Sequence, residues 1–309
     1  MPSVSGIEVS ALCLGANVFG WSADAEQSFA VLDAFAGAGG TFVDTADSYM
    51  WRAPGNSGGE SETILGDWMA ARGNRDAMVI ATKVGSWPER PGLGGENIKA
   101  ACEDSLRRLR TDHIDLYYAH RDDPDTAQEE TLDAFDSLVK EGKVRAVAAS
   151  NFSASRLRSA LEISDRDGLT RYAALQPHYN LMERADYEAS LAPLLESEDI
   201  ACFPYYALAA GFLTGKYRAG ETVDSVRAAG ASKYLDDPRA GGVLASLYEI
   251  AEGHGTTQAA VALAWLASRP TVTAPIASAR TVEQLEGILP ALTLTLTDDE
   301  LRLLSHVSS

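Results

Sequence analysis

Short apolar segments alternate with amphipathic segments along almost the whole chain. Eight of the apolar segments are apolar on both faces, which is typical of parallel strands covered by helices. The predicted strands are residues 12–14, 41–43, 78–81, 114–118, 144–148, 173–175, 200–203 and 272–276.

The segments between these strands carry apolar residues at helical spacing. The first of them, 26–38, ends at Gly39 and Gly40, which form a typical helix stop. The other predicted helices are 98–109, 130–139, 155–163 and 258–266. Residues 281–284 and 297–300 match the capping-box pattern of helix starts. Because the second box follows the eighth strand, it predicts an additional C-terminal helix.

Eight strand–helix units without a linker predict an α/β fold, namely a (β/α)8 TIM barrel forming a single domain over residues 1–309. We expect a strand or hairpin region at its N-terminus and the extra helix at its C-terminus. A doubly wound sheet is the alternative, because a strand count does not prove closure. Such a sheet normally carries G-x-G-x-x-G after its first strand, and this motif is absent. The longest irregular regions predicted, 49–59, 85–95 and 215–239, all follow strands, where barrel enzymes place functional loops.

Composition and charge narrow the class of protein. Of the 309 residues, 46% are hydrophobic and 23% are charged, as in ordinary globular proteins. The formal net charge of −18 argues against a nucleic-acid or anionic-lipid partner, since both require a basic surface. Cys13, Cys102 and Cys202 form no C-x-x-C pair and are interpreted as core residues in a reducing compartment. With no signal-peptide pattern and no apolar run of about 20 residues, the sequence predicts a cytoplasmic protein without membrane contact.

Polar residues follow six of the predicted strands directly. In a barrel, the C-terminal ends of the strands surround one site, so these side chains are expected to converge. They are Asp44 with Asp47 and Tyr49 just beyond, Lys83, His120, Ser150 with Asn151, Gln176, and Tyr205 with Tyr206.

Four of these residues together suit carbonyl chemistry. The pKa of tyrosine is ordinarily near 10, so Tyr49 needs a nearby ammonium, such as Lys83, to stabilise its phenolate. Asp44 is suited to orient that ammonium, and His120 to hydrogen-bond a carbonyl oxygen. The set contains no nucleophile, so a hydride from a cofactor is the natural complement. Each residue alone also has a structural interpretation, as a turn cap, a surface amine, a core histidine or a packed aromatic ring.

The sequence around these residues resembles the aldo-keto reductase family over nearly the whole chain. No single matching segment is specific, but their order and spacing are. The matching segments are 42–49, 58–62, 81–84, 114–120, 150–153, 175–181 and 208–216.

The resemblance implies a barrel that binds NADP(H), less often NAD(H), at its mouth and reduces a small-molecule carbonyl compound. It makes Tyr49 the general acid, tuned by Lys83 and Asp44, with His120 orienting the carbonyl. No metal is implied. The residues that it assigns to the cofactor are Ser150, Asn151, Gln176, Tyr205, Leu208, Gly211, Lys216, Ser278, Arg280 and Gln284.

Within this set, the resemblance gives separate tasks to the two ends of the cofactor. Ser150, Asn151 and Gln176 are expected to hold the nicotinamide carboxamide, with Tyr205 stacked on the ring. The 208–216 segment is expected along the pyrophosphate, and Ser278, Arg280 and Gln284 at the 2′-phosphate of NADPH. The sequence departs from the family where Ala277-Ser278 replaces Pro-Gly and Gly287-Ile288 replaces Glu-Asn, which affects the adenine contacts.

Three tryptophans, Trp21, Trp51 and Trp87, fall on separate loops near the expected site. As aromatic walls of a substrate pocket, they favour an apolar or aromatic carbonyl compound. The alternative is that they simply pack the loops.

Other functions account for fewer of these residues. A non-catalytic nicotinamide-binding subunit, like the β subunits of some potassium channels, is the main alternative, but all four catalytic positions are filled. A glycosidase using Asp44 and Glu60 leaves Lys83 and His120 without tasks. A metal hydrolase built on His120, Asp122 and Asp123 lacks a second histidine at ligand spacing.

Overall fold

A computed structural model describes residues 1–217 and 228–309, and in these residues one sheet contains eight parallel strands. The order around the sheet is β11-β10-β9-β8-β5-β4-β3-β12. Each strand overlaps one predicted apolar segment. The strands are β3 (Cys13–Gly15), β4 (Phe42–Asp44), β5 (Val79–Val84), β8 (Ile114–Ala119), β9 (Val144–Ser150), β10 (Tyr172–Gln176), β11 (Ala201–Cys202) and β12 (Ile276–Ala277).

The sheet closes between β11 and the segment that precedes β12. Cys202 forms a parallel bridge with Val272, and the amide of Thr273 donates to the Cys202 carbonyl at 2.8 Å. The chain is therefore a closed (β/α)8 barrel, as predicted. The prediction of a continuous eighth strand over 272–276 was wrong, because regular pairing is limited to β12. Pro275 lies in this segment and has no amide hydrogen to donate to a ladder.

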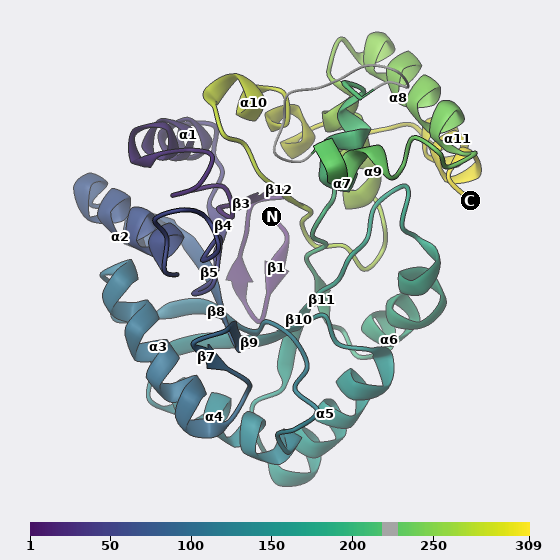
Figure 1. Cartoon of the computed structure of the whole chain (residues 1–309). Helices are drawn as coiled ribbons and strands as arrows, with labels where there is room; N and C mark the ends of the chain where they lie inside the picture. The colour runs from purple at the N-terminus through teal and green to yellow at the C-terminus, as the bar shows by residue number, and fades with distance from the viewer. Residues whose placement is uncertain (218–227) are drawn as a thin grey trace.

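Helices surround the barrel, as Figure 1 shows. All five helices predicted from apolar spacing are present, as α1 (Ala25–Gly37), α3 (Gly95–Leu109), α4 (Gln128–Lys140), α5 (Ala154–Asp167) and α9 (Gln258–Ala267). Helices not predicted are α2 (Glu60–Arg72), α6 (Ala192–Ser197) and α8 (Ala240–His254). On α2 the buried face includes Ser61, Glu62 and Gly66, which interrupt the apolar stripe. Glu62 is buried because it accepts hydrogen bonds from Thr82 and Arg108.

The two predicted capping boxes have different outcomes. At α11 (Asp298–Val307), Thr297 and Glu300 form both reciprocal hydrogen bonds, and this is the predicted C-terminal helix. At α10 (Val282–Glu286), the Thr281 hydroxyl accepts from the Gln284 amide, but the Gln284 side chain accepts from the amide of Arg280. The second half of that box is therefore absent, and Gln284 holds the preceding loop instead.

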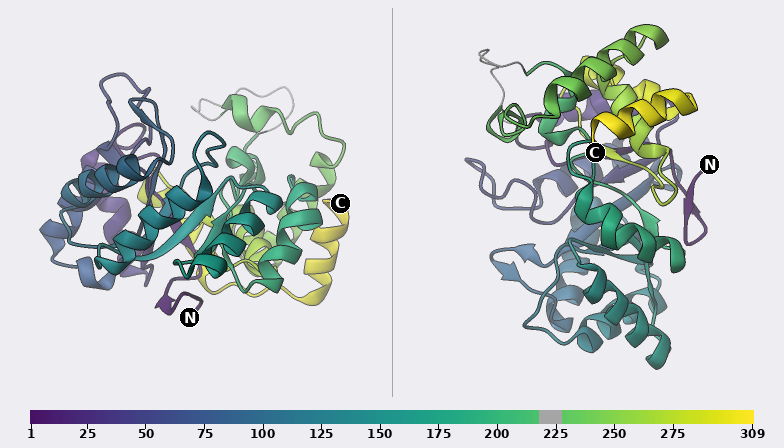
Figure 2. Two further views of the ribbon diagram at one scale, coloured as in Figure 1. Left: turned by 90° about the horizontal axis from the view of Figure 1, so that it is seen from below. Right: turned by 90° about the vertical axis from the view of Figure 1, so that its right-hand side faces the viewer.

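An N-terminal hairpin covers one end of the barrel. Its strands β1 (Ser3–Val4) and β2 (Ile7–Glu8) are antiparallel and lie across the ring of strands in Figure 1. Val4 and Ile7 pack with the interior residues of the barrel. The hydroxyl of Ser10 then accepts hydrogen bonds from the amides that begin β4. The hairpin thus closes the end where strands start, and Figure 2 shows the long loops at the opposite end.

Those loops are more regular than predicted. Region 85–95 contains a small hairpin, β6 (Ser86–Trp87) and β7 (Arg90–Pro91). Region 215–239 includes α7 (Ala228–Ser232), while its residues 218–227 lie outside the described part of the chain. In the described ranges no helix has the length and apolar character needed to cross a bilayer, and all three cysteines are buried and unpaired.

Candidate active site

Strand periodicity brings the polar strand ends into one layer. Side chains alternate along a strand, so a residue two positions beyond an interior residue also faces the interior. The barrel interior contains Phe42, Ala81, Tyr118, Ala148 and Ala174. The residues two positions further along are Asp44, Lys83, His120, Ser150 and Gln176. The five polar side chains therefore form a layer above the apolar interior of the barrel, at the C-terminal end of the strands.

Asp44, Lys83 and Tyr49 form a closed triangle of hydrogen bonds. The Lys83 ammonium Nζ lies 2.6 Å from Asp44 Oδ2 and 2.6 Å from the Tyr49 hydroxyl. The Tyr49 hydroxyl donates to the same Asp44 oxygen at 2.9 Å. The third ammonium donor goes to the carbonyl of Thr45 at 2.7 Å, so all three Lys83 donors are satisfied.

The two charged members of this triangle are buried. The Lys83 side chain is 0% exposed and that of Asp44 is 2% exposed. Burial lowers the pKa of Lys83, while the Asp44 carboxylate acts in the opposite direction and favours the ammonium. A buried ion pair is costly unless its remaining donors and acceptors are bonded. Here the second carboxylate oxygen of Asp44 also has a partner, since Gln176 Nε2 donates to it at 2.9 Å.

The phenol of Tyr49 holds its proton in this setting. Burial raises the pKa of Tyr49 well above its ordinary value, and the Asp44 carboxylate raises it further. Lys83 alone would stabilise the phenolate and lower the pKa of Tyr49. In this structure, burial and the Asp44 carboxylate outweigh that effect, so the pKa is raised. A protonated hydroxyl beside an ammonium is the state that a proton donor requires.

His120 is neutral and has an unused nitrogen. Burial lowers the pKa of His120 well below its ordinary value, and the charges of Lys83 and Arg121 lower it further. Its ring lies edge-on to Tyr49, with ring centroids 5.9 Å apart. Among the described residues, its buried Nδ1 has no hydrogen-bond partner. The residue lines the same cavity as Tyr49, so its ring borders the space that a ligand oxygen would enter.

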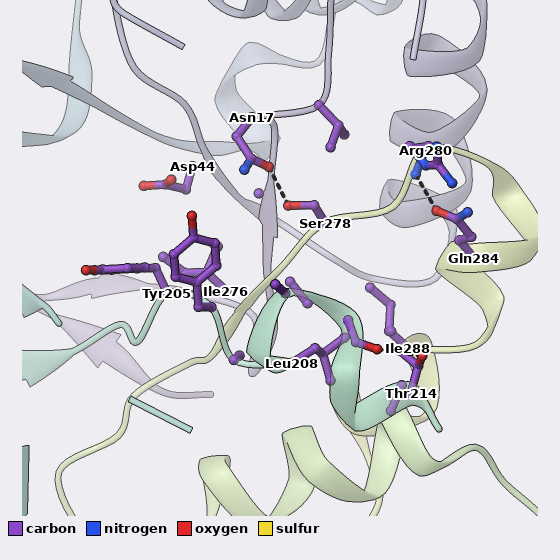
Figure 3. A pocket seen from close by; sticks show the side chains of 18 of the residues that line it. Asn17, Asp44, Tyr205, Leu208, Thr214, Ile276, Ser278, Arg280, Gln284 and Ile288 are labelled. Carbon is purple, nitrogen blue, oxygen red and sulfur yellow. Dashed lines mark hydrogen bonds between the residues drawn. The ribbon is translucent and has the colours of Figure 1, made fainter. Parts of the chain in front are cut away.

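One cavity of about 570 Å³ contains this site and extends well beyond it. Asp44, Tyr49 and His120 line it, whereas Lys83 lies beneath them. All ten residues assigned to the cofactor also line it, namely Ser150, Asn151, Gln176, Tyr205, Leu208, Gly211, Lys216, Ser278, Arg280 and Gln284. Figure 3 shows Asp44 and Tyr205 toward one side of this cavity and Arg280 and Gln284 toward the other.

At the end near Asp44, the polar side chains are bonded to one another. Asn151 Nδ2 donates to the carbonyl of His120 at 3.0 Å and to Ser150 Oγ at 3.0 Å. Tyr205 donates its hydroxyl to Asn151 Oδ1 at 2.7 Å. Asn151 also has a left-handed backbone with φ of 58°. These hydrogen bonds fix the orientation of the Asn151 side-chain amide and of the Tyr205 ring before any ligand binds.

At the opposite end, cations line the cavity without carboxylate partners. Neither Lys216 nor Arg280 forms a salt bridge within residues 1–217 and 228–309; the Lys216 ammonium lies over the Tyr217 ring at 5.0 Å. Ser278 donates its hydroxyl to Asn17 Oδ1 at 2.6 Å, as drawn in Figure 3. No sequence pattern singles out Asn17, which lies 261 residues before Ser278.

The backbone between these two ends is strained. Tyr206, Ala209, Ala210 and Gly211 all have positive φ, between 49° and 95°. Such a conformation costs energy for residues other than glycine and is concentrated at ligand sites. The small side chains at 209–211 let a ligand approach the main chain closely. The cavity fits an extended nicotinamide dinucleotide. It has an amide and an aromatic ring at one end, a backbone that a ligand can approach in the middle, and cations without salt bridges at the other end.

The three tryptophans were expected to line a substrate pocket. None of Trp21, Trp51 and Trp87 is among the described residues that line the cavity. A Cβ at Gly58 would lie 2.9 Å from Cε2 of Trp87, so Trp87 packs closely on the loop after Tyr49. Trp51 is covered by the guanidinium of Arg52 at 4.8 Å. Packing explains both contacts, and a role in binding substrate stays a prediction.

Arg121 lines the cavity without having been assigned to it from the sequence, whereas Tyr206 lines it as expected for a strand-end residue. Arg121 directly follows His120, so its position after a strand was the available signal. Tyr206 is 52% exposed and packs edge-on against His178. No arrangement of three or more His, Cys, Asp or Glu side chains suited to a metal ion occurs in the described residues.

The chain is similar to known proteins over nearly its whole length. The family model described as "Aldo/keto reductase family" matches residues 11–308. Norsolorinic acid reductase stcV of Emericella nidulans is 35% identical over an alignment that covers 96% of this chain and 78% of that protein. The uncharacterized oxidoreductase YrpG of Bacillus subtilis is 33% identical, with 98% and 93% covered. Protein tas of Escherichia coli is 31% identical, with 96% and 93% covered.

Proposed function

This chain belongs to the aldo/keto reductase family, whose members reduce small-molecule carbonyl compounds with a nicotinamide cofactor, and we propose that Tyr49 is its proton donor and NADPH its preferred cofactor. The product of the proposed reaction is the alcohol. The observation that carries this proposal is the triangle of Tyr49, Lys83 and Asp44 beneath the cavity that all ten residues assigned to the cofactor line.

The triangle supplies a proton to a carbonyl oxygen. As negative charge develops on that oxygen, Tyr49 releases its hydroxyl proton to it. The Lys83 ammonium, 2.6 Å away, then stabilises the phenolate that is left. Asp44 keeps Lys83 charged despite complete burial, because its carboxylate lies 2.6 Å from the ammonium. The position of the His120 ring in the cavity lining, edge-on to Tyr49, supports a role for this ring in binding or orienting the substrate oxygen.

The other cavity residues position the cofactor in this proposal. A bound nicotinamide supplies the hydride to the carbonyl carbon. The donors of Ser150 and Asn151 are bonded within the protein, so these residues offer their side-chain oxygens as further acceptors for the carboxamide. Tyr205, held by Asn151, offers its ring for stacking. Gln176 donates one amide hydrogen to Asp44, so it also couples the carboxamide site to the triangle.

A preference for NADPH follows from the opposite end of the cavity. The Arg280 guanidinium forms no salt bridge in the described residues, although Glu283 also lines the cavity, and Ser278 and Gln284 lie beside it in the cavity lining. A phosphate dianion gains charge-assisted hydrogen bonds there, whereas the 2′-hydroxyl of NADH gains less.

The test is a titration followed by an assay. The purified protein is titrated with NADPH and with NADH by fluorescence, and oxidation of the nucleotide is then followed by absorbance with a panel of aldehydes, ketones and diketones. We expect tighter binding of NADPH and oxidation that depends on the carbonyl compound. Binding without turnover on any panel member would favour the non-catalytic alternative, and failure of both nucleotides to bind would overturn the proposal.

A further inference from the structure

Arg121 stands out because most arginines in this acidic chain are paired. The sequence contains 44 Asp and Glu residues against 26 Lys and Arg residues. Most arginines in the described part of the chain form salt bridges, for example Arg75 with Asp115 at 2.8 Å and Arg156 with Asp122 at 2.7 Å. Arg121 lines the cavity, is exposed, and has no hydrogen bond or salt bridge within the described ranges. Its donors are therefore available to a ligand.

The position of Arg121 separates it from the cations assigned to the cofactor phosphates. It follows β8, whereas Arg280 follows β12 and Lys216 follows β11. In the sheet order, β8 is four strands from β12, which in a closed ring of eight places them on opposite sides. In Figure 1, β8 and β12 are labelled on opposite sides of the ring. Arg121 is thus across the barrel mouth from Arg280.

Arg121 lies close to the reacting groups. It is bonded directly to His120, the neutral ring beside Tyr49. Its charge helps lower the pKa of His120, after burial and Lys83. It also opposes the rise that burial causes in the pKa of Tyr205. Arg121 lines the cavity together with Tyr49, His120 and Tyr205, which border the part where the carbonyl substrate is proposed to bind.

We propose that Arg121 binds a carboxylate on the substrate, so that the enzyme prefers carbonyl compounds that carry an acidic group. This inference rests on the proposed function, since it assigns a substrate class to the same site. The planar guanidinium offers paired donors that match the two carboxylate oxygens. A chain with net charge −18 repels anions at a distance, so an acidic substrate requires a local cation of this kind.

The experiment compares two aldehydes that differ in charge. Wild type, Arg121→Gln and Arg158→Gln are assayed with NADPH on 4-carboxybenzaldehyde and on its uncharged methyl ester. Arg158 is an exposed arginine on α5 that is outside the cavity and has no salt bridge in the described residues, so its variant controls for the change in net charge. Calorimetry with 4-(hydroxymethyl)benzoate on the NADP-loaded protein measures carboxylate binding independently of turnover.

In Arg121→Gln, we expect the ratio of kcat/KM for the acid to kcat/KM for the ester to fall about tenfold or more, as loss of a charge-assisted hydrogen bond predicts. The Kd for 4-(hydroxymethyl)benzoate is expected to rise by a similar factor. Arg158→Gln is expected to keep the wild-type ratio and Kd, and Arg121→Lys to fall between wild type and Arg121→Gln.

Two results would overturn the inference while leaving the proposed function intact. One is a ratio in Arg121→Gln equal to that in Arg158→Gln, which would make Arg121 a solvated surface charge. The other is weaker NADPH binding with an unchanged ratio, which would make Arg121 a cofactor residue. Absence of turnover by wild type on both aldehydes counts against the proposed function, and calorimetry then still decides whether Arg121 binds a carboxylate.

Discussion

The charged side chains at the two ends of the cavity differ in whether they are bonded within the protein. At the inner end, formed by Asp44, Tyr49 and Lys83, each charge is bonded within the protein and withdrawn from water. At the outer end, formed by Lys216, Ser278 and Arg280, the cations have no carboxylate partner in the described residues. Figure 3 shows Asp44 and Arg280 on opposite sides of the cavity, with Ser278 between them.

In the proposed function, this difference assigns the chemical step to the inner end of the cavity and cofactor binding to the outer end. The inner end is organised before a ligand arrives, so it can stabilise developing charge without rearrangement. The outer end has cations that form no salt bridge in the described residues, so in the proposed function it contributes affinity and selectivity for the cofactor. Substitutions at the inner end should therefore change turnover and folding stability, and substitutions at the outer end should change Kd.

The largest effect is expected for Tyr49→Phe at the inner end. The variant removes the transferable proton and little else, so kcat is expected to fall by about 10²- to 10⁴-fold, the range of general acid catalysis. The Kd for NADPH, measured by fluorescence, should stay near the wild-type value. Turnover like that of wild type would show that Tyr49 is not the proton donor.

Lys83→Met should be the next most damaging change. Loss of the ammonium is expected to lower kcat by roughly 10²-fold or more, and it leaves Asp44 buried without its cation, at a cost of about 3–5 kcal/mol in the free energy of unfolding. Kinetics and urea unfolding measure the two effects.

The double variant Lys83→Met with Asp44→Asn is the matched control for Lys83. It removes the unpaired charge, so it should recover much of the stability but not the turnover. Recovery of turnover together with stability would show that Lys83 acts only by maintaining the fold.

Asp47 extends the inner end and should produce a dependence of stability on pH. Burial raises the pKa of Asp47 to about 7, and the neighbouring charge of Glu62 acts in the same direction. An unfolded aspartate has a pKa near 3.9, so between about pH 4 and pH 7 the folded protein binds more protons than the unfolded chain. The stabilising contribution of Asp47 is therefore present below about pH 4 and is lost as pH rises toward 7.

Replacement of Asp47 by asparagine tests this dependence. Relative to wild type, Asp47→Asn should gain about 2 kcal/mol in the free energy of unfolding between pH 5 and pH 7. Urea unfolding at the two pH values measures it. An equal pH dependence in both proteins would mean that Asp47 is ionised in the folded state.

The smallest effect is expected for Arg280→Ala at the outer end. The Kd for NADPH should rise about tenfold more than the Kd for NADH, because only NADPH carries the 2′-phosphate. The difference should shrink at high salt, since the site is open to solvent. Equal changes for the two nucleotides would remove Arg280 from the phosphate site.

The positions of the reactive residues followed from the sequence because strand ends are local features. Asp44, Lys83 and His120 each come two positions after an interior residue, and closure of parallel strands brings such ends together. The same reasoning identified five of the helices, since apolar spacing reports which face of a helix packs inward. It missed α2, because Glu62 is buried there by pairing with Arg108 and not by being apolar.

The sequence by itself determined the barrel, the order of its elements and the residue types at the mouth, since the burial of each element leaves a periodic pattern in its own residues. Only the tertiary structure decided which side chains bond to each other. Gln176 reaches Asp44 across 132 residues, and Arg121 lies opposite Arg280 because of the strand order. These relations depend on the closure and register of the sheet, which long-range contacts fix and no local pattern records.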